Sequence, residues 1–492
     1  MNDKIDLLNS RSAPEETLIK PNRPTQVKPF KALAYVLIFL FVIFLIFKFN
    51  GSNNNSSSWL DYLPFIGQVK HLVESANTTL KGEDRNRINV LLLGIGGQGH
   101  DGAYLTDTMM LASLEPKEKK VALVSIPRDL SVPIENLGWQ RINSVNAYAE
   151  IKTPGSGGLA VSQAVSNILQ TPIDYYLTVD FSGFAKVIDD LGGVKVNVEN
   201  TLDDYTYPIL GSEDAPWDQR WEHLHIDTGE QIMSGELALK YVRSRHALGV
   251  EGSDFARSRR QQKILSAVKE KVMSLNMLFR PGTISKIIAD ITGNYQTNLK
   301  IWEIIKLWGL VKDINGADII NRVLDNSPGG LLVDAVGADG AYLLSPRSGN
   351  FSEIQYLLNN IFDEAPINDK EKVTREKAAI EVRNGTWING LASRVALDLE
   401  KYGFDIVRIG NSHQQNFQKS VIYDLSYGAK IQALQILKDR TNANVALGMP
   451  QWLIDDMAKD LANEKNPIQP DFILLLGKDA DATRSGVENT VQ

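Results

Sequence analysis

An unbroken run of 16 apolar residues, Ala32 to Phe47, constrains this chain of 492 residues more than any other feature. The wider segment 30–49 would form a helix about 30 Å long, which matches the hydrocarbon core of a bilayer. The flanking Lys31 and Lys48 can extend their ammonium groups to the lipid headgroups. The run therefore predicts a transmembrane helix over residues 30–49.

A cleaved signal peptide and a buried core helix are the two alternatives to a membrane anchor. About 30 residues precede the run, and the sequence after it, GSNNNSSSW, contains no A-x-A-like cleavage site, which disfavours a signal peptide. Phe, Ile and Leu cover every face of the helix, and nothing nearby supplies partner elements for a core helix. The basic residues before the run predict a cytoplasmic N-terminus and an extracellular remainder; they are Lys20, Arg23, Lys28 and Lys31.

The composition excludes several classes of protein. Hydrophobic residues make up 43% and charged residues 23%, as in ordinary globular domains. The net charge of −7 gives no general attraction to nucleic acid, so we expect no nucleic-acid partner. Cysteine is absent, which excludes thiol catalysis, cysteine-bound zinc and disulfides.

Strands and helices alternate after residue 88, which predicts an α/β sandwich around one central sheet. NVLLLGIG, LTDTMMLASL and VALVSIP are typical of strands, and YYLTVDFSGFAKVIDDLGGVKVNV predicts strand, helix, Gly-Gly stop and strand. A long helix is expected over Asp254 to Ser274 with Ser253 as its N-cap. The last unit, residues 378–480, is typical of a small βαβ-type domain.

The chain is accordingly divided into eight segments. They are a disordered cytoplasmic tail (1–29), the transmembrane helix (30–49), a juxtamembrane linker (50–87), a catalytic domain (88–275), its extension (276–365), a charged linker (366–377), the C-terminal domain (378–480) and a tail (481–492).

Gly94, Gly96 and Gly99 have the G-x-G-x-x-G spacing of dinucleotide sites. That fingerprint requires a helix directly after the glycines, whose N-terminus meets the pyrophosphate. Here the chain continues through HDGAYLTD into another strand, so we interpret the glycines as a loop between strands.

A cluster of basic side chains between residues 240 and 263 favours a phosphate-binding site. Arg257, Arg260 and Gln261 have i, i+3, i+4 spacing and share a helix face, whereas Arg243 and Arg245 point the same way only if their segment is extended. A guanidinium can grip two phosphate oxygens at once. The alternative is a solvated charged face. The cluster contains Lys240, Arg243, Arg245, Arg257, Arg259, Arg260 and Lys263.

Asp107 and Arg128 stand where apolar strands begin or end. Asp107 is either a turn cap or a ligand for a hard divalent cation. Arg128 either joins a polyphosphate site or pairs with its neighbour Asp129. His223 and His225 lie close together, but no third ligand stands at an obvious spacing, so we interpret them as ordinary strand or loop residues.

Five motifs occur in an order that resembles the LytR-CpsA-Psr family of cell-wall glycopolymer transferases. They are TDTMMLASL, SIPRDL, RINSVNAYAE, VDFSGFAKVIDDLGGVKVNV and GELALKYVRSRH…SDFARSRRQQKIL, within Ile88 to Leu275. The terminal unit, IEVRNGTWINGLASRVALDLEKYGFDIV…FILLLGKD, resembles the LytR C-terminal domain. The resemblance implies a phosphotransferase that moves a glycopolymer from a polyprenyl-pyrophosphate carrier to peptidoglycan at a lipid membrane.

The resemblance also implies a role for each site residue. Arg128, Arg243 and Arg245 would act in catalysis by gripping phosphate, and Arg141, Arg257 and Gln261 would bind substrate. Asp107 would help to hold Mg²⁺ on the pyrophosphate. Arg141 stands where the family usually has Lys.

Two departures from the family pattern concern the metal. The usual G-x-D aspartate is Gly96 here, and the usual arginine before the D-T motif is Leu105. His100 and Asp101 in the following loop are candidates for the lost ligand. A hydrolase of the same lipid-linked substrate, and a non-catalytic wall-binding or regulatory protein, therefore remain alternative functions.

Overall fold

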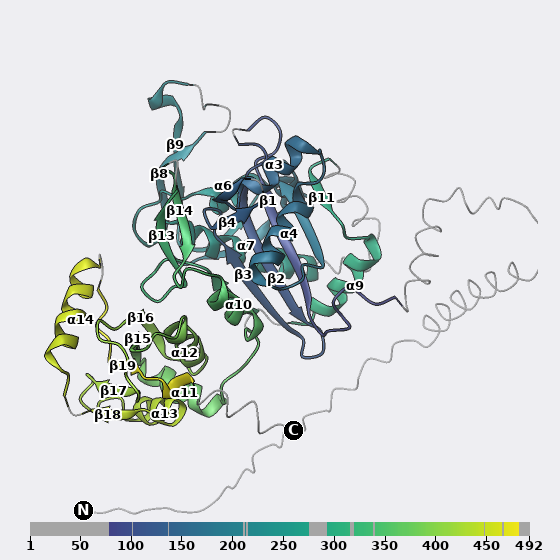
Figure 1. Cartoon of the computed structure of the whole chain (residues 1–492). Coiled ribbons are helices and arrows are strands. Elements are labelled where there is room, and N and C mark those ends of the chain that lie inside the picture. Colours follow the sequence, from purple (N-terminus) through teal and green to yellow (C-terminus); the bar gives the residue numbers. More distant parts are fainter. Residues whose placement is uncertain are drawn as a thin grey trace, which may run out of the picture. The chain divides into compact units, whose positions relative to one another are not determined.

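The computed structural model describes residues 78–481 apart from 101, 136, 210–211, 213–214, 275–292, 315–318, 338–339, 447 and 465–466 (Figure 1). The predicted transmembrane helix, residues 30–49, lies outside these described residues. Among the helices of the described part, none combines the length and the apolar character needed to cross a membrane.

A six-stranded mixed sheet forms the centre of the larger domain, with the strand order β11-β6-β1-β2-β3-β12. Neighbours β1, β2 and β3 are antiparallel, whereas β6 pairs with β1 and β12 with β3 in parallel. The three successive strands predicted from the sequence are thus confirmed, and the fold is mixed α/β. The strands are β1 (Ile88–Ile95), β2 (Thr106–Glu115), β3 (Lys120–Ile126), β6 (Tyr175–Asp180), β11 (Tyr295–Thr297) and β12 (Ile319–Val323).

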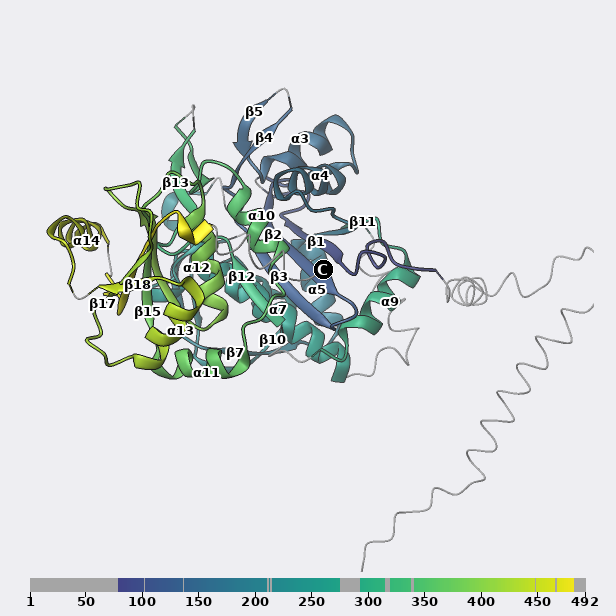
Figure 2. The same ribbon diagram turned by 60° about the horizontal axis from the view of Figure 1, so that its bottom comes forward.

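Both faces of this sheet are buried, which explains why β1 is a continuous apolar run. Leu91 and Leu93 enter one core, whereas Ile88 and Val90 enter the core on the opposite face. Figure 2 shows α3 and α4 on one side of the sheet and α7 and α9 on the other. The covering helices are α3 (Ser144–Lys152), α4 (Gly157–Leu169) and α10 (Ser352–Asn359) on the first face, and α7 (Asp254–Ser274) and α9 (Ile301–Val311) on the second.

A third apolar core lies beside the sheet and includes the helix and the second strand of the predicted strand–helix–strand unit, whose first strand, β6, belongs to the central sheet. Gly192 and Gly193 separate the helix from the next strand with φ of +74° and +80°, a conformation that glycine adopts without strain. The elements here are α5 (Phe181–Asp190), β7 (Val194–Val198), β8 (Leu202–Pro208), η3 (Trp217–Gln219), β9 (Trp221–Ile226), β10 (Gly229–Met233), α6 (Gly235–Arg243) and η4 (Gly249–Glu251).

The segments on either side of the expected catalytic domain contribute to its fold. In the expected extension, β11 and β12 form the two edges of the central sheet, and β13 (Leu332–Val336) pairs with β14 (Tyr342–Pro346). In the expected linker 50–87, residues 78–87 are folded: Leu80 is buried, and Arg85 forms an ion pair with Asp174 at 2.6 Å.

The C-terminal domain contains a five-stranded sheet with the order β16-β15-β19-β17-β18. It contains the expected βαβ arrangement, with α12 between the parallel strands β15 and β16, but the expected linker 366–377 is a helix, α11 (Ile367–Glu376), held by the fully buried Val373. The sequence did not predict this helix, because most of its residues are charged or polar and only one side chain is buried. The other elements are β15 (Ala379–Asn384), α12 (Leu391–Lys401), β16 (Asp405–Asn411), β17 (Val421–Asp424), α13 (Ile431–Thr441), β18 (Asn444–Ala446), α14 (Gln451–Asn463) and β19 (Phe472–Leu476).

Candidate active site

A cavity of about 550 Å³ opens where β1 and β6 end and β2 begins. The helices α5, α6 and α7 and the β8–β9 hairpin enclose it. Most of its wall is apolar, and charged side chains gather at one end. The apolar lining includes Leu92, Leu177, Val179, Phe184, Val187, Ile188, Leu239, Val242, Ile264, Leu265 and Val268. The polar lining includes Asp107, Arg128, Asp180, Arg243, Arg245, Arg257 and Gln261.

A second cavity, of about 200 Å³, meets the first at its charged end. Both cavities are lined by Asp107, Thr108, Arg128, Arg257 and Gln261, so these five residues form the boundary between them. Six of the side chains predicted from the sequence therefore line one connected space: Asp107, Arg128, Arg243, Arg245, Arg257 and Gln261.

Asp107 and Arg128 are brought together by the antiparallel pairing of β2 and β3. Met109 pairs with Ile126, so Asp107, two residues before Met109, lies beside the chain that follows β3. Arg128 donates from Nη1 to Asp107 Oδ1 at 2.7 Å, and its Nε lies 3.6 Å from Asp129 Oδ2. Arg128 thus pairs with its neighbour, which was one of the two alternatives, and it also lines the cavity.

Arg141 lies one contact further from the cavity. It is the last residue of β5 (Gly138–Arg141), which pairs with β4 (Ser131–Ile134). Its Nη1 lies 3.4 Å from Oδ1 of the buried Asp129, whose other oxygen faces Arg128. Arg141 is not among the residues that line either cavity, so its predicted contact with substrate gains no support from this geometry.

Arg257 and Gln261 face the site from α7, one helical turn apart. Arg257 Nη2 lies 3.4 Å from the backbone oxygen of Asp107, and Gln261 Nε2 donates to Thr108 Oγ1 at 2.8 Å. The helix begins as predicted, because Ser253 Oγ accepts a hydrogen bond from the amide of Ala256 at 3.0 Å.

Arg260 does not line the cavity with Arg257 and Gln261. This corrects the expectation, drawn from their spacing, that the three side chains face the same site. Its side chain is buried and donates to the backbone oxygens of Tyr241 and Ser244. It also pairs with the Glu251 carboxylate at 2.7 Å. Arg260 therefore fixes the segment that follows α6 and does not line the cavity.

The last residue of α6, Arg243, and the segment after it, with Arg245, reach the cavity. Arg243 ends α6, and the next residue, Ser244, has an extended ψ of 136°, so the two arginines point to the same side. The Arg243 guanidinium lies 4.3 Å from the ring centroid of Phe181 and donates to Tyr207 Oη at 3.2 Å. Burial raises the pKa of Tyr207, although Arg243 opposes this, so the phenol remains neutral and accepts the hydrogen bond.

Asp180 is a site residue that the sequence reasoning missed. It ends β6 opposite Ile95, and it lines the same cavity as Asp107. Its Oδ1 accepts a hydrogen bond from the amide of Gly183 at 2.7 Å, which caps α5, and its Oδ2 accepts one from Asn294 at 3.0 Å. The sequence signal was a carboxylate at a strand end, which resembles any helix cap. Asp101, the predicted metal ligand, lies outside the described residues.

Comparisons with known proteins agree with the sequence motifs. A model of the LytR_cpsA_psr family matches residues 66–358, and a model described as LytR cell envelope-related transcriptional attenuator matches residues 377–479. The chain is 28% identical over 280 residues to the polyisoprenyl-teichoic acid–peptidoglycan teichoic acid transferase TagV of Bacillus subtilis, covering 56% of this chain and 65% of that protein. It is 24% identical to the cell wall biosynthesis protein LcpA of Corynebacterium glutamicum, covering 70% and 66%.

The chain thus spans just under two thirds of the length of these two curated relatives. A solved structure, that of B. subtilis TagV, is 27% identical, with a TM-score of 0.42 and coverage of 57% of this chain and 99% of that one. The family model matches more than half of the 492 residues. The protein therefore belongs to the LytR-CpsA-Psr family.

Proposed function

We propose that this protein is a membrane-anchored phosphotransferase that attaches a glycopolymer from a polyprenyl-pyrophosphate carrier to peptidoglycan. The observation that carries the proposal is the form of the large cavity, which joins an apolar wall to a charged end with four arginines, Arg128, Arg243, Arg245 and Arg257. A molecule that fits both parts has a long apolar tail and an anionic head. A polyprenyl pyrophosphate has this form, and the name of the relative TagV includes a polyisoprenyl-linked donor.

In the proposed reaction, a peptidoglycan hydroxyl attacks the phosphorus that carries the glycopolymer. The bond from this phosphorus to the bridging oxygen breaks, and polyprenyl phosphate leaves with the electron pair of that bond and takes up the proton of the attacking hydroxyl, so that a phosphodiester links the polymer to the wall. Negative charge develops on the leaving phosphate, and guanidinium groups held at the charged end of the cavity stabilise it. Arg243 is held by Phe181 and Tyr207, and Arg128 by Asp107, so little reorganisation is needed.

Mg²⁺ is proposed as the cofactor, held by Asp107 and by Asp180 in place of the missing G-x-D aspartate. Carboxylate oxygens are the donors that this cation prefers, and both side chains line the cavity. In the contacts given above, no carboxylate oxygen of Asp107 or Asp180 accepts more than one hydrogen bond. Each oxygen therefore keeps a lone pair with which it could coordinate the cation. When bound, the ion would neutralise pyrophosphate charge. Asp101 remains the alternative second carboxylate.

Binding of Mn²⁺, measured by electron paramagnetic resonance with inorganic pyrophosphate present, distinguishes the two carboxylates. Asp180→Asn keeps an acceptor for the Gly183 amide and thus the helix cap, but it removes the charge. If Asp180 is the ligand, this variant weakens Mn²⁺ binding and Asp101→Ala does not. The reverse result assigns the role to Asp101.

The decisive experiment for the function is a transfer assay with a synthetic lipid-linked donor and peptidoglycan fragments. Polymer joined to peptidoglycan, with polyprenyl phosphate released, supports the transferase. Release of polymer phosphate into water without an acceptor supports the hydrolase. Donor binding without turnover would support the wall-binding or regulatory protein, which the missing G-x-D aspartate keeps as an alternative.

We further propose that residues 30–49 anchor the chain in the cell membrane and that the domains after residue 50 are extracellular. The apolar run and four of the basic residues before it, Lys20, Arg23, Lys28 and Lys31, support this topology. Protease added to intact cells or spheroplasts should digest the chain after residue 50 and spare the N-terminal tail. Protection of the large domains until lysis would overturn the orientation.

A further inference from the structure

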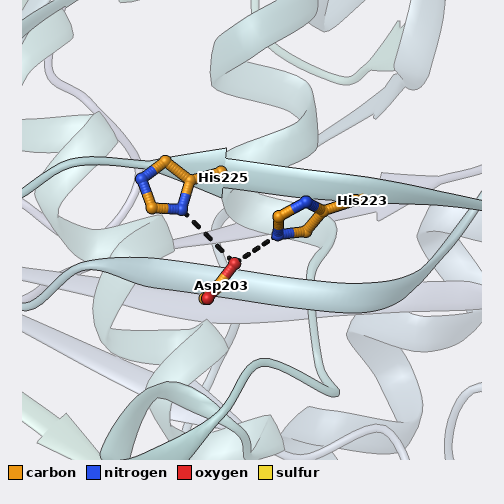
Figure 3. A group of neighbouring side chains, drawn as sticks. All are labelled: Asp203, His223 and His225. Atoms are coloured by element: carbon orange, nitrogen blue, oxygen red, sulfur yellow. Dashed lines mark hydrogen bonds and ion pairs between the residues drawn. The ribbon is translucent and has the colours of Figure 1, made fainter.

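The β8–β9 hairpin carries two histidines and an aspartate on one face, away from the residues assigned to transfer. Asp203 on β8 pairs directly with His225 on β9 in the antiparallel register. His223 precedes His225 by two residues on the same strand and so points to the same side. Figure 3 shows all three side chains meeting between the two strands.

The donor atoms of these residues converge on one point. Asp203 Oδ1 contacts His223 Nε2 directly and lies 3.3 Å from His225 Nδ1. One donor atom from each residue lies within 4.8 Å of the other two. Asp203 is about a quarter exposed and each histidine side chain 46% exposed, so an ion from solvent can reach the cluster.

Two neighbours hold the histidine rings in place. His225 Nε2, the nitrogen that faces away from Asp203, lies 3.2 Å from Asp227 Oδ1. A histidine that binds a metal through one nitrogen commonly donates its other N–H to a carboxylate, which orients the ring and raises its basicity. The ring of Tyr205 stacks on His223 at a centroid distance of 4.1 Å and an interplanar angle of 7°.

We propose that Asp203 Oδ1, His223 Nε2 and His225 Nδ1 bind a divalent transition-metal ion of the Zn²⁺ class. Imidazole nitrogen and carboxylate oxygen are regular zinc donors, with bonds of about 2.0–2.2 Å. Donor atoms at the vertices of such a coordination sphere lie about 3–3.5 Å apart, so small side-chain movements bring this cluster to that geometry. Three protein ligands leave a fourth position for water or an external ligand.

An ion at this site would tie the two strands of the hairpin together beside the large cavity. Asp204, the residue after Asp203, points to the opposite side, where it lines the cavity and accepts a hydrogen bond from Ser244 Oγ at 2.7 Å. Strand pairing is irregular between Asp204 and Tyr207. Metal binding would therefore stabilise a wall of the cavity at the point where the pairing of β8 and β9 is interrupted. It is expected to raise the melting temperature of the protein.

The test is isothermal titration of Zn²⁺ alone into the full-length chain, produced without a polyhistidine tag and treated with a chelator. The proposal predicts one site per chain, with affinity lowered at least tenfold by His223→Gln or by Asp203→Asn. His413→Gln, at an exposed histidine in the C-terminal domain, is the matched control and should leave the affinity unchanged.

Two further measurements distinguish a site from adventitious binding to surface histidines. Co²⁺ should give visible d–d absorption typical of low coordination in the parent, and His223→Gln should abolish it while His413→Gln does not. Zn²⁺ should raise the melting temperature of the parent more than that of Asp203→Asn. Equal Zn²⁺ affinities in the parent and both hairpin variants, or no Zn²⁺ binding, would overturn the proposal and leave a metal-free hydrogen-bonded cluster.

Discussion

Arg128 donates from Nη1 to Asp107 Oδ1 at 2.7 Å and thereby joins the chain after β3 to the beginning of β2 at the charged end of the cavity. The pair is partly exposed, at 22% and 37% of the two side chains, so solvent screens it and its value for folding is small. Its position, at the boundary shared by both cavities, indicates that it serves the site.

Asp107→Asn should therefore lower transfer activity by more than about tenfold, or about 1.4 kcal/mol of transition-state stabilisation, with little change in melting temperature. The amide keeps the shape but removes the charge that orients Arg128. Asp84→Asn, on an exposed turn before β1, is the control. An unchanged kcat/KM in the lipid-linked donor assay would remove Asp107 from the site.

Arg243→Lys and Arg245→Lys should each reduce transfer by more than about tenfold although the charge is retained. A lysine cannot form the planar two-pronged grip on phosphate, and at position 243 it would also lose the stacked contact with Phe181. Arg259→Lys, on the exposed side of α7, should change little. If both variants melt like the parent and transfer at its rate, the arginines form only a charged surface.

Val268→Phe should weaken the binding of a ligand with a long prenyl tail but not that of a ligand without one. Val268 lines the apolar part of the cavity, and the added ring would occupy space that a long prenyl chain needs. Binding of undecaprenyl pyrophosphate should weaken at least tenfold, whereas binding of inorganic pyrophosphate should not change. Val250→Phe, at a 70% exposed residue, is the control. Equal loss for both ligands would mean that the substitution disturbs the charged end instead.

Arg260→Met should destabilise the fold by about 3–5 kcal/mol, because it leaves a partly buried carboxylate and three carbonyl groups without their donor. The Glu251 carboxylate and the backbone oxygens of Tyr241, Ser244 and Glu251 are the groups affected. Denaturant unfolding measures the change. Arg259→Met should stay within about 0.5 kcal/mol of the parent. Similar losses in the two variants would contradict the separate roles of these adjacent arginines.

The pKa of His225 should lie above its ordinary value of 6.5 in the metal-free protein, because Asp203 and then Asp227 accept hydrogen bonds from the protonated ring. A raised folded-state pKa means that this stabilisation is complete below the unfolded value and is lost as pH rises through the folded one. Histidine-labelled NMR titration measures it. Asp203→Asn should lower the pKa, whereas Asp84→Asn should not. A parent value at or below 6.5 would show that the contacts do not persist in solution.

Local sequence patterns were sufficient for the elements whose signal lies within one segment. The apolar runs of β1, β2 and β3 are continuous because both faces of the sheet are covered, and Ser253 caps α7 through its own hydroxyl. The placement of Arg257 and Gln261 together follows from helix geometry alone, since i and i+4 residues lie on one face.

The tertiary structure decided the features that depend on residues distant in the chain. Arg260 shares the spacing of Arg257 and Gln261, yet the loop after α6 supplies carbonyl partners that draw it away from the cavity. Asp180 joins Asp107 only because β6 pairs in parallel with β1.

The cluster around Asp203 shows the same division. The sequence gives the two-residue spacing of His223 and His225, whereas the structure places both on β9, which fixes their common direction, and the third donor lies 20 residues from His223. Only the register of the β8–β9 hairpin brings Asp203 opposite His225. The sequence by itself thus determined the fold class, the elements and the family, because periodicity, capping and motif order are local. Which side chains meet was decided by strand pairing and packing, whose free energy comes from contacts between segments that no local pattern encodes.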